Sequence, residues 1–449
     1  MDYTITIFGA TGNLMYKKLM PALVRLIYSE KISTNVEIRC VGRKVLTNQA
    51  YKRLLYEKSQ AKKGELKRVF RQLSYYSVDF SDPSTYSALQ TTTKGSIYYL
   101  AIPPGLFSVV ANSLSLSGLV EKGNPKHRVV FEKPFGEDLA SASSINKELT
   151  KYLSEQQIYR IDHYLGKDMI QNVLFLRFTN GLFENTWNKD FIESVTIMAK
   201  ESETVMDRGN YYDGIGALKD MVQSHLMQLS ALIAMEQPRE FTSELIRQAK
   251  VDVLTNMSIK TEDVVLGQYK GYLKELHIPE DSKTETFVYI KAMIDTPRWH
   301  GVPFYFVTGK ALDEKRSEVR IVFKSSSQGD AFWPKEKLSN NELVIRIAPE
   351  EGVTLNFNVK ALGLSQVIQQ EFLDYSHEWI GFGDNPEAYE KLFLDIFQGN
   401  MTLFTSWNEV EAAWKIIHEL REHRPKPYRY ASFKDMMKEV KKTLPEVRG

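Results

Sequence analysis

The sequence predicts two domains of different fold class, with the boundary near residue 175. We expect residues 1–175 to form an α/β domain with a doubly wound parallel sheet. We expect residues 176–449 to form an α+β domain with a large, mainly antiparallel sheet covered by helices. The length of 449 residues exceeds one ordinary domain. In the first part strand-like runs alternate with helical ones, which favours parallel pairing. In the second part several strand-like runs are separated only by turns, which favours antiparallel pairing.

Composition excludes some classes of function. The 58 Lys and Arg residues nearly balance the 56 Asp and Glu residues, so no overall field favours nucleic acid. Cys40 is the single cysteine, which prevents an intramolecular disulfide and suits a reducing cytosol. No apolar run approaches the roughly 20 residues of a membrane span, and the acidic start Met1-Asp2 is unlike a signal peptide. We therefore expect a cytoplasmic protein with no nucleic-acid partner and no membrane partner.

The first strand, residues 3–8, runs into a glycine turn that we interpret as a cofactor-binding loop. An amphipathic helical segment follows, in which Pro21 either opens a regular stretch or kinks a longer one. Strand, glycine turn and helix begin a Rossmann-like unit, because the glycines let the backbone approach a pyrophosphate. The spacing is only G-x-x-G, so a plain strand-to-helix turn is the alternative. The predicted cofactor-binding residues in this loop are Gly9, Ala10, Thr11, Gly12, Asn13 and Leu14.

The second strand, residues 36–41, ends just before Arg43 and Lys44. An acidic residue at this position would hold the ribose 2′-hydroxyl of NAD, whereas a basic residue suits the 2′-phosphate of NADP. We therefore predict NADP as the cofactor, with NAD as the second choice. Two solvated cations after a strand are the alternative interpretation.

Further strands are predicted at 75–78, 96–102, 128–131 and 158–161, and a strongly basic helix at 49–72 reads as a solvated face. The carboxyl ends of parallel strands share one edge, where ligands bind. The residues that we place at this edge are Gly9, Arg43, Pro103, Lys133 and Asp162. In the second domain we expect a helix over 216–235 and strands over 191–200, 286–295, 302–308, 318–324 and 342–347. The charged tail from residue 422 is expected to form a peripheral helix.

The junction at 160–167 places four polar side chains where a strand gives way to a helix. Free N–H groups at a helix start attract phosphate, and His163, Tyr164 and Lys167 add three donors. Asp162 is available to orient a base elsewhere, and His225 lies on an apolar helical stripe interrupted by polar residues. A desolvated imidazole with a carboxylate on its second nitrogen is a general base. The alternative for the junction is a solvated turn with one ion pair. The alternative for His225 is a histidine that only packs in the core.

These segments together resemble one family. R-I-D-H-Y-L-G-K at 160–167 resembles the signature of the glucose-6-phosphate dehydrogenase family. Residues 9–23, 129–136, 208–225 and 299–315 match further segments of that family in the same order. The resemblance extends over nearly the whole chain.

The resemblance implies an enzyme of the oxidative pentose phosphate pathway. It would oxidise D-glucose 6-phosphate at C1 to 6-phospho-D-glucono-1,5-lactone with NADP, need no metal, and assemble into homodimers or homotetramers. His225 resembles the base and Asp162 its carboxylate partner. Arg43 and the glycine loop would hold NADP, and Pro103 falls at the same edge. Lys133 resembles the lysine between substrate and nicotinamide. The other residues that resemble substrate ligands are His163, Tyr164, Lys167, Glu201, Asp220, Lys310 and Lys315.

The sequence also departs from the family pattern at several positions. Asn13 stands where the family has aspartate, Ala348 stands where many members have glutamine, and the tail at 428–433 differs from the family ending. A relative that oxidises another sugar is one alternative, because E-K-P-x-G also occurs in other sugar oxidoreductases. A non-enzymatic paralogue that binds NADP or a sugar phosphate is another, and Asn13 and the altered tail motivate it. The intact pair of Asp162 and His225 argues against a sensor, because a sensor needs no base.

Overall fold

The computed structural model describes residues 3–90, 95–325, 338–364, 367–376, 386–422 and 425–447. The chain forms two compact units. The first comprises Met1–Gly166, Glu240–Arg247 and Asp384–Glu411, and the second comprises Lys167–Arg239, Gln248–Gly383 and Ala412–Gly449. The predicted fold class is confirmed, with a parallel sheet in the first unit and a mostly antiparallel sheet in the second.

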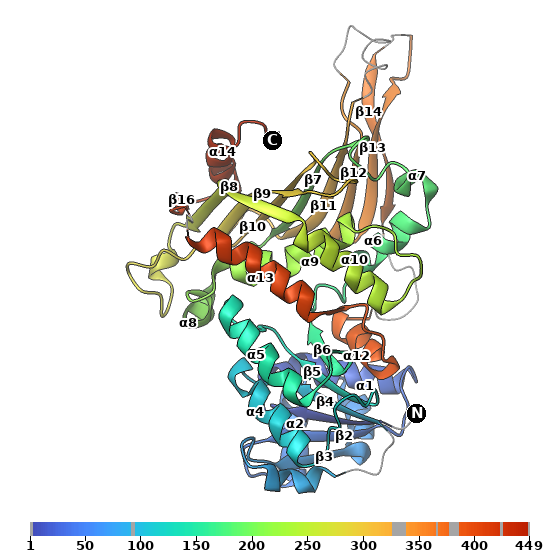
Figure 1. The fold of residues 1–449 in the computed structure, drawn as a ribbon, viewed down its shortest axis with the longest axis vertical. Helices are drawn as coiled ribbons and strands as arrows, with labels where there is room; N and C mark the ends of the chain where they lie inside the picture. The colour runs from blue at the N-terminus through green and yellow to red at the C-terminus, as the bar shows by residue number, and fades with distance from the viewer. Residues whose placement is uncertain are drawn as a thin grey trace. The chain divides into compact units, whose positions relative to one another are not determined.

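The sheet of the first unit has seven strands within the described residues, in the order β15-β6-β5-β4-β1-β2-β3 (Figure 1). All neighbours pair in parallel except β15, which runs antiparallel to β6. The strand bounds are β1 (Tyr3–Phe8), β2 (Glu37–Gly42), β3 (Leu73–Ser77), β4 (Gly95–Leu100), β5 (His127–Phe131), β6 (Ile158–Ile161) and β15 (Phe404–Thr405). The carboxyl ends of β6, β5, β4, β1 and β2 therefore lie along one edge.

Helices flank this sheet. Buried residues of α4 and α5 pack with the strands in one apolar cluster, and α1 packs with α3 and α12. The α-helices are α1 (Met20–Tyr28), α2 (Asn48–Lys58), α3 (Lys63–Val69), α4 (Phe107–Leu116), α5 (Leu139–Tyr152) and α12 (Ala388–Gln398). Shorter helical turns are η1 (Met15–Leu19), η2 (Phe70–Gln72), η3 (Pro83–Leu89), η4 (Pro104–Leu106) and η5 (Glu155–Gln157). Pro21 lies in the first turn of α1, directly after the π-helical η1, so the helix continues without Pro21 donating a hydrogen bond.

One predicted helix, 49–72, is wrong as a single element, because α2 ends at Lys58 and α3 begins at Lys63. Ser59 has an extended backbone (φ −70°, ψ 142°). Its hydroxyl oxygen accepts the N–H of Ala61 at 3.1 Å. A serine side chain that binds a nearby N–H offers the backbone an alternative to the helix, so the chain turns here.

The sheet of the second unit has nine strands within the described residues, in the order β14-β13-β12-β11-β7-β10-β9-β8-β16 (Figure 1). Pairing is antiparallel except between β10 and β7 and between β16 and β8. The five predicted strands correspond to β7 (Ile192–Lys200), β9 (Phe287–Ile294), β10 (Pro303–Gly309), β11 (Arg316–Phe323) and β12 (Glu342–Ala348). Strands that the sequence reading did not predict are β8 (Met257–Tyr269), β13 (Gly352–Lys360), β14 (Ile368–Ser376) and β16 (Tyr428–Tyr430).

The predicted helix over 216–235 is present as a π-helical stretch, η7 (Leu218–Leu226), that continues into α9 (Met227–Ala234). Other helices of the second unit are α6 (Asp168–Phe178), α7 (Gly181–Glu184), α8 (Gly209–Tyr212) and α14 (Phe433–Thr443), with the turns η6 (Met206–Arg208) and η8 (Tyr272–Lys274). α10 (Ser243–Thr255) and α13 (Trp407–Glu422) have residues in both units. The tail helix α14 is less peripheral than expected, because Met436 and Val440 are buried in a core cluster. Among the described residues, no helix is both long and apolar enough to cross a membrane.

Candidate active site

The turn after β1 depends on Gly9. Its φ is +85°, and a Cβ at this position would lie 2.1 Å from the carbonyl oxygen of Ala101. Only glycine fits such a position. The N–H groups of Gly9 and Ala10 both donate to the carbonyl of Val41 at 3.0 Å, and the N–H of Gly12 donates to that of Gly9 at 2.9 Å. The first turn of the following helix is therefore presented at the sheet edge, as a phosphate site requires.

Arg43 lies at the same edge, exposed after β2. Asp79, which follows the neighbouring strand β3, has a lowered pKa. The main causes are its hydrogen bonds from Ser81, and the charge of Arg43 makes a smaller contribution. The guanidinium of Arg43 is thus near the ends of two strands while remaining accessible to a ligand.

Lys133 follows a glutamate that two tyrosines hold. The hydroxyl of Tyr99 donates to Glu132 Oε1 at 2.5 Å, and that of Tyr389 lies 3.3 Å from the same oxygen. Burial raises the pKa of Glu132, and these hydrogen bonds oppose the rise. Tyr99 is on β4 and Tyr389 on α12, so residues distant in sequence support the turn that carries Lys133. The sequence does not indicate this support, because a tyrosine in a buried strand usually indicates only packing and Tyr389 is 257 positions from Glu132.

Asp162 is buried directly after β6. One of its carboxylate oxygens accepts the N–H of Tyr164 at 3.0 Å, and its carbonyl accepts that of Leu165 at 3.1 Å. This turn fixes the carboxylate relative to the strand. Lys167 caps the N-terminus of α6 in an extended conformation. Asp162, His163 and Tyr164 belong to the first unit, and Lys167 belongs to the second.

In the second unit, Glu201 and Lys310 are brought together as an ion pair although they are 109 positions apart. The Lys310 ammonium also lies 5.3 Å from the ring centre of Tyr212. Burial is the main cause that raises the pKa of Tyr212. The charges of nearby carboxylates, which include Asp220 and Glu201, raise it further. Two predicted sugar-hydroxyl ligands and one predicted phosphate ligand therefore lie near one tyrosine.

Lys315 does not join this group within the second unit. Its ammonium lies 3.8 Å from Glu203, and both side chains are more than half exposed. An exposed ion pair of this kind contributes little to structure.

His225 is buried in η7, and the start of that stretch is fixed by Glu285. Glu285 Oε1 accepts the N–H of Leu218 at 3.1 Å. Gly216 has φ +70°, and a Cβ there would lie 2.3 Å from the same oxygen. π-helical stretches are frequent at functional sites. The only sequence signal for this arrangement is the glycine pair before the helix.

The far end of the same helix is held by Arg177, which is fully buried. Its guanidinium donates to the carbonyls of Ile233 and Met235, both at 2.9 Å. The indole N–H groups of Trp187 and Trp299 donate to the carbonyls of Ile233 and Ala234 at 2.8 and 2.7 Å. Burial lowers the pKa of Arg177 to about 10, so the side chain remains a cation at neutral pH. These donors satisfy the open carbonyls at the helix end.

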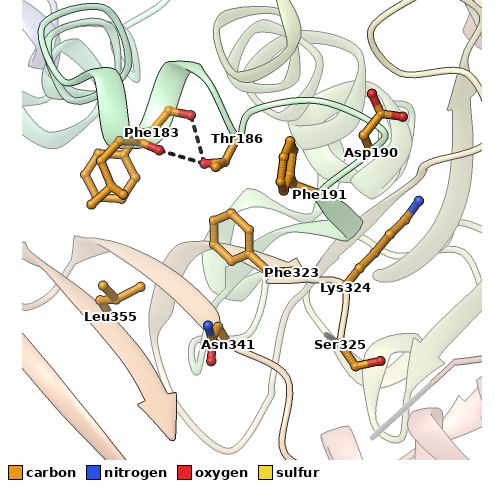
Figure 2. Close-up of a pocket in the computed structure, with 10 residues that line it drawn as sticks. Phe183, Thr186, Asp190, Phe191, Phe323, Lys324, Ser325, Asn341 and Leu355 are labelled. Atoms are coloured by element: carbon orange, nitrogen blue, oxygen red, sulfur yellow. Dashed lines mark hydrogen bonds between the residues drawn. The ribbon is translucent and has the colours of Figure 1, made fainter. Parts of the chain in front are cut away.

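A separate cavity of about 510 Å³ lies in the second unit (Figure 2). The rings of Phe183, Phe191 and Phe323 surround it, with Lys324 and Asp190 among the other lining residues. None of the residues predicted for the site lines this cavity. Half of the described lining is apolar and Lys324 is the one cation in it, so this cavity is poorly suited to a sugar phosphate, which needs several cations and hydrogen-bond donors.

Comparisons with known proteins find similarity to one family along nearly the whole chain. Residues 6–172 match the family model described as glucose-6-phosphate dehydrogenase, NAD binding domain. Residues 174–446 match the one described as glucose-6-phosphate dehydrogenase, C-terminal domain. The glucose-6-phosphate 1-dehydrogenase of Chlamydia muridarum is 38% identical over 456 residues, covering 93% of this chain and 89% of the relative. That of Bacillus subtilis is 37% identical over 444 residues, covering 93% and 91%. A solved structure of glucose-6-phosphate dehydrogenase in complex with its substrate glucose-6-phosphate has a TM-score of 0.90 and 32% identity, covering 100% of this chain and 98% of the other.

Proposed function

The chain belongs to the glucose-6-phosphate dehydrogenase family, and from this premise we propose that it oxidises D-glucose 6-phosphate at C1 to 6-phospho-D-glucono-1,5-lactone with transfer of hydride to NADP. It is an oxidoreductase of this enzyme type. The observation that carries the proposal is the match of both family models together with the complete segment at 160–167. In the cell this reaction would be the first step of the oxidative pentose phosphate pathway, in the cytoplasm.

His163, Tyr164, Lys167 and Lys310 would bind the 6-phosphate. Fixing the phosphate holds a small, flexible sugar in place, and this binding energy orients the reacting carbon. Glu201 would accept hydrogen bonds from sugar hydroxyls beside Lys310, which is supported by the ion pair between them. Asp220 would do the same, and Lys315 would add a second positive charge.

His225 would act as the general base. It would take the proton from the C1 hydroxyl, and Asp162 would orient its imidazole and stabilise the imidazolium. Two observations support these roles: both side chains are buried, and the carboxylate of Asp162 accepts the N–H of Tyr164. Lys133 would lie between the sugar and the nicotinamide.

The residues at the strand ends of the first unit fit a dinucleotide. Gly9 has no room for a side chain, so a pyrophosphate can approach the loop from Gly9 to Leu14. Arg43 is exposed and would bind the 2′-phosphate of NADP, with NAD as a second choice. Pro103 would contact the dinucleotide after β4. When bound, the nicotinamide supplies the acceptor for the hydride.

We further propose that residues 1–175 form the NADP-binding domain and that residues 176–449 serve substrate binding and oligomerisation. The protein would be a homodimer or a homotetramer. Size-exclusion chromatography with light scattering would test this part, and a monomer at micromolar concentration would contradict it.

The function is tested by following the absorbance of reduced nicotinamide with purified protein. Glucose 6-phosphate and glucose would each be assayed with NADP and with NAD. We expect turnover with the phosphorylated sugar and a preference for NADP. Turnover with glucose but not with glucose 6-phosphate would contradict the assignment of the phosphate-binding residues. No turnover in a protein that still binds NADP would favour the non-enzymatic paralogue.

A further inference from the structure

The C-terminal segment forms the edge strand β16, which lies beside β8 (Figure 1). Tyr430 pairs with Tyr269 in parallel register, and the carbonyl of Tyr430 accepts the N–H of Lys270 at 2.7 Å. The helix α14 that follows buries Met436 and Val440 in the core cluster that also contains Tyr430. This part of the tail is therefore anchored to the sheet on both sides of Tyr430.

The Tyr430 side chain is completely buried, and its hydroxyl lies 2.5 Å from the carbonyl oxygen of Lys310. Burial raises the pKa of Tyr430, so the phenol remains protonated. The carbonyl oxygen of Thr286 lies 3.3 Å from the same hydroxyl, and the shorter contact shows that the single phenol proton is donated mainly to Lys310. The hydroxyl of Thr286, 3.0 Å from the phenol oxygen, must then be the donor in that contact. Thr286 in turn accepts the N–H of Tyr269 at 3.0 Å.

The result is one continuous chain of hydrogen bonds from β8 to the carbonyl of Lys310. Neighbouring bonds in such a chain polarise and strengthen one another in a buried setting. The N–H of Lys310 is bound as well, by the carbonyl of Thr286 at 2.9 Å. The turn continues through Ala311, whose φ is +51°, and the N–H of Leu312 binds the carbonyl of Glu201 at 3.0 Å. Both peptide groups of Lys310 are thus held while its ammonium pairs with Glu201.

We propose that Tyr430 is a positioning residue for Lys310, so that the C-terminal strand sets the affinity for the phosphorylated sugar. The proposal rests on the proposed function, in which Lys310 binds the 6-phosphate. Removing the phenol hydroxyl leaves a buried carbonyl without its donor and releases the turn that carries the ammonium. The effect would fall on substrate binding, because Tyr430 itself is too deeply buried to touch the sugar.

The test measures KM for glucose 6-phosphate and for NADP, and kcat, in Tyr430→Phe. We expect KM for glucose 6-phosphate to rise about fivefold, the equivalent of one ordinary hydrogen bond, while KM for NADP and kcat stay within about twofold. Thr286→Val, which interrupts the chain one bond further away, should give a smaller rise in the same direction. Tyr428→Phe is the matched control, since Tyr428 lies on the same strand but is exposed, and it should have no effect.

Lys310→Ala and the double variant decide how Tyr430 acts. If Tyr430 works through Lys310, Tyr430→Phe adds nothing to KM in the Lys310→Ala background. Independent, multiplying effects would overturn the inference, as would an unchanged KM in Tyr430→Phe while Lys310→Ala raises it. An unchanged KM in Lys310→Ala would instead contradict the proposed role of Lys310 and remove the premise of the inference.

Discussion

The predicted cofactor residues of the first unit and the predicted substrate residues of the second unit are held in different ways. Gly9 and Arg43 follow the neighbouring parallel strands β1 and β2, and their place is set mainly by where each strand ends. Glu201 and Lys310 also follow strands, but buried side chains from distant parts of the chain hold them. A strand-end site depends on backbone conformation, whereas the second kind of site depends on complete hydrogen bonding of buried groups. The two units should therefore respond differently to substitution.

The largest effect is expected at His225. If the chemistry resides in the helix of the second unit, His225→Asn should lower kcat by about 10³-fold with a similar KM, as for loss of a general base. Steady-state kinetics with glucose 6-phosphate and NADP measures this. His300→Asn is the control, because His300 is exposed and bonded to Asp295. A His225 variant that retains most of its activity would exclude this residue as the base.

A large loss of stability is expected at Arg177, which tests whether the second unit depends on buried polar side chains. Arg177→Met removes the donors for three carbonyls at the end of α9, at Leu232, Ile233 and Met235. The free energy of unfolding should fall by about 3 kcal/mol. Urea unfolding followed by circular dichroism measures it. Arg208→Met at an exposed position should change the free energy of unfolding little. Equal losses in both variants would contradict the dependence of the second unit on buried polar side chains.

A smaller effect is expected at Arg43, which tests the strand-end site of the first unit. Because Arg43 is exposed, Arg43→Ala should leave stability unchanged. It should raise KM for NADP about tenfold or more and leave KM for NAD nearly unchanged, since only NADP carries the 2′-phosphate. Arg53→Ala is the control, because Arg53 is exposed and pairs with Glu57 on its own helix. Equal losses with both cofactors would contradict the assignment.

The smallest effect is expected at Asp395 on α12, a half-buried acid of the first unit. It tests whether a buried polar group in that unit also affects stability. Burial raises the pKa of Asp395 from 3.8 to about 6, and a hydrogen bond from Asn400 opposes this. A raised pKa means that the folded state favours the protonated acid. The contribution of protonated Asp395 to the free energy of unfolding is fully present below about pH 4, and it is lost as pH rises through about 6.

Asp395→Asn should therefore gain stability relative to the unchanged protein between pH 4 and pH 7, by about 1 kcal/mol after allowance for partial exposure. Thermal unfolding of both proteins across this pH range measures the difference. Asp281→Asn at an exposed position should show no such trend. A constant difference at all pH values would exclude Asp395 as the titrating group.

Much of the first unit could be predicted from the sequence, because its signals are local. Most strands of the parallel sheet are rich in apolar or aromatic residues, and the glycine after β1 marks the turn. The break at Ser59 was missed, because helical periodicity continues across it and one serine hydrogen bond decides against it. In the second unit the sequence analysis did not identify β13, although apolar and polar residues alternate along Val353–Val359. It also did not identify β14, whose mostly exposed residues show no regular alternation.

The sequence by itself determined the fold class, the residues at the strand ends and the family, because strand periodicity, glycine turns and the segment at 160–167 are written in neighbouring residues. Only the tertiary structure decided what holds the predicted residues in place. Tyr430 and Lys310 are 120 positions apart, and Arg177 and Met235 are 58 apart. A buried donor finds its acceptor through packing of the whole unit, and no spacing in the sequence specifies that partner.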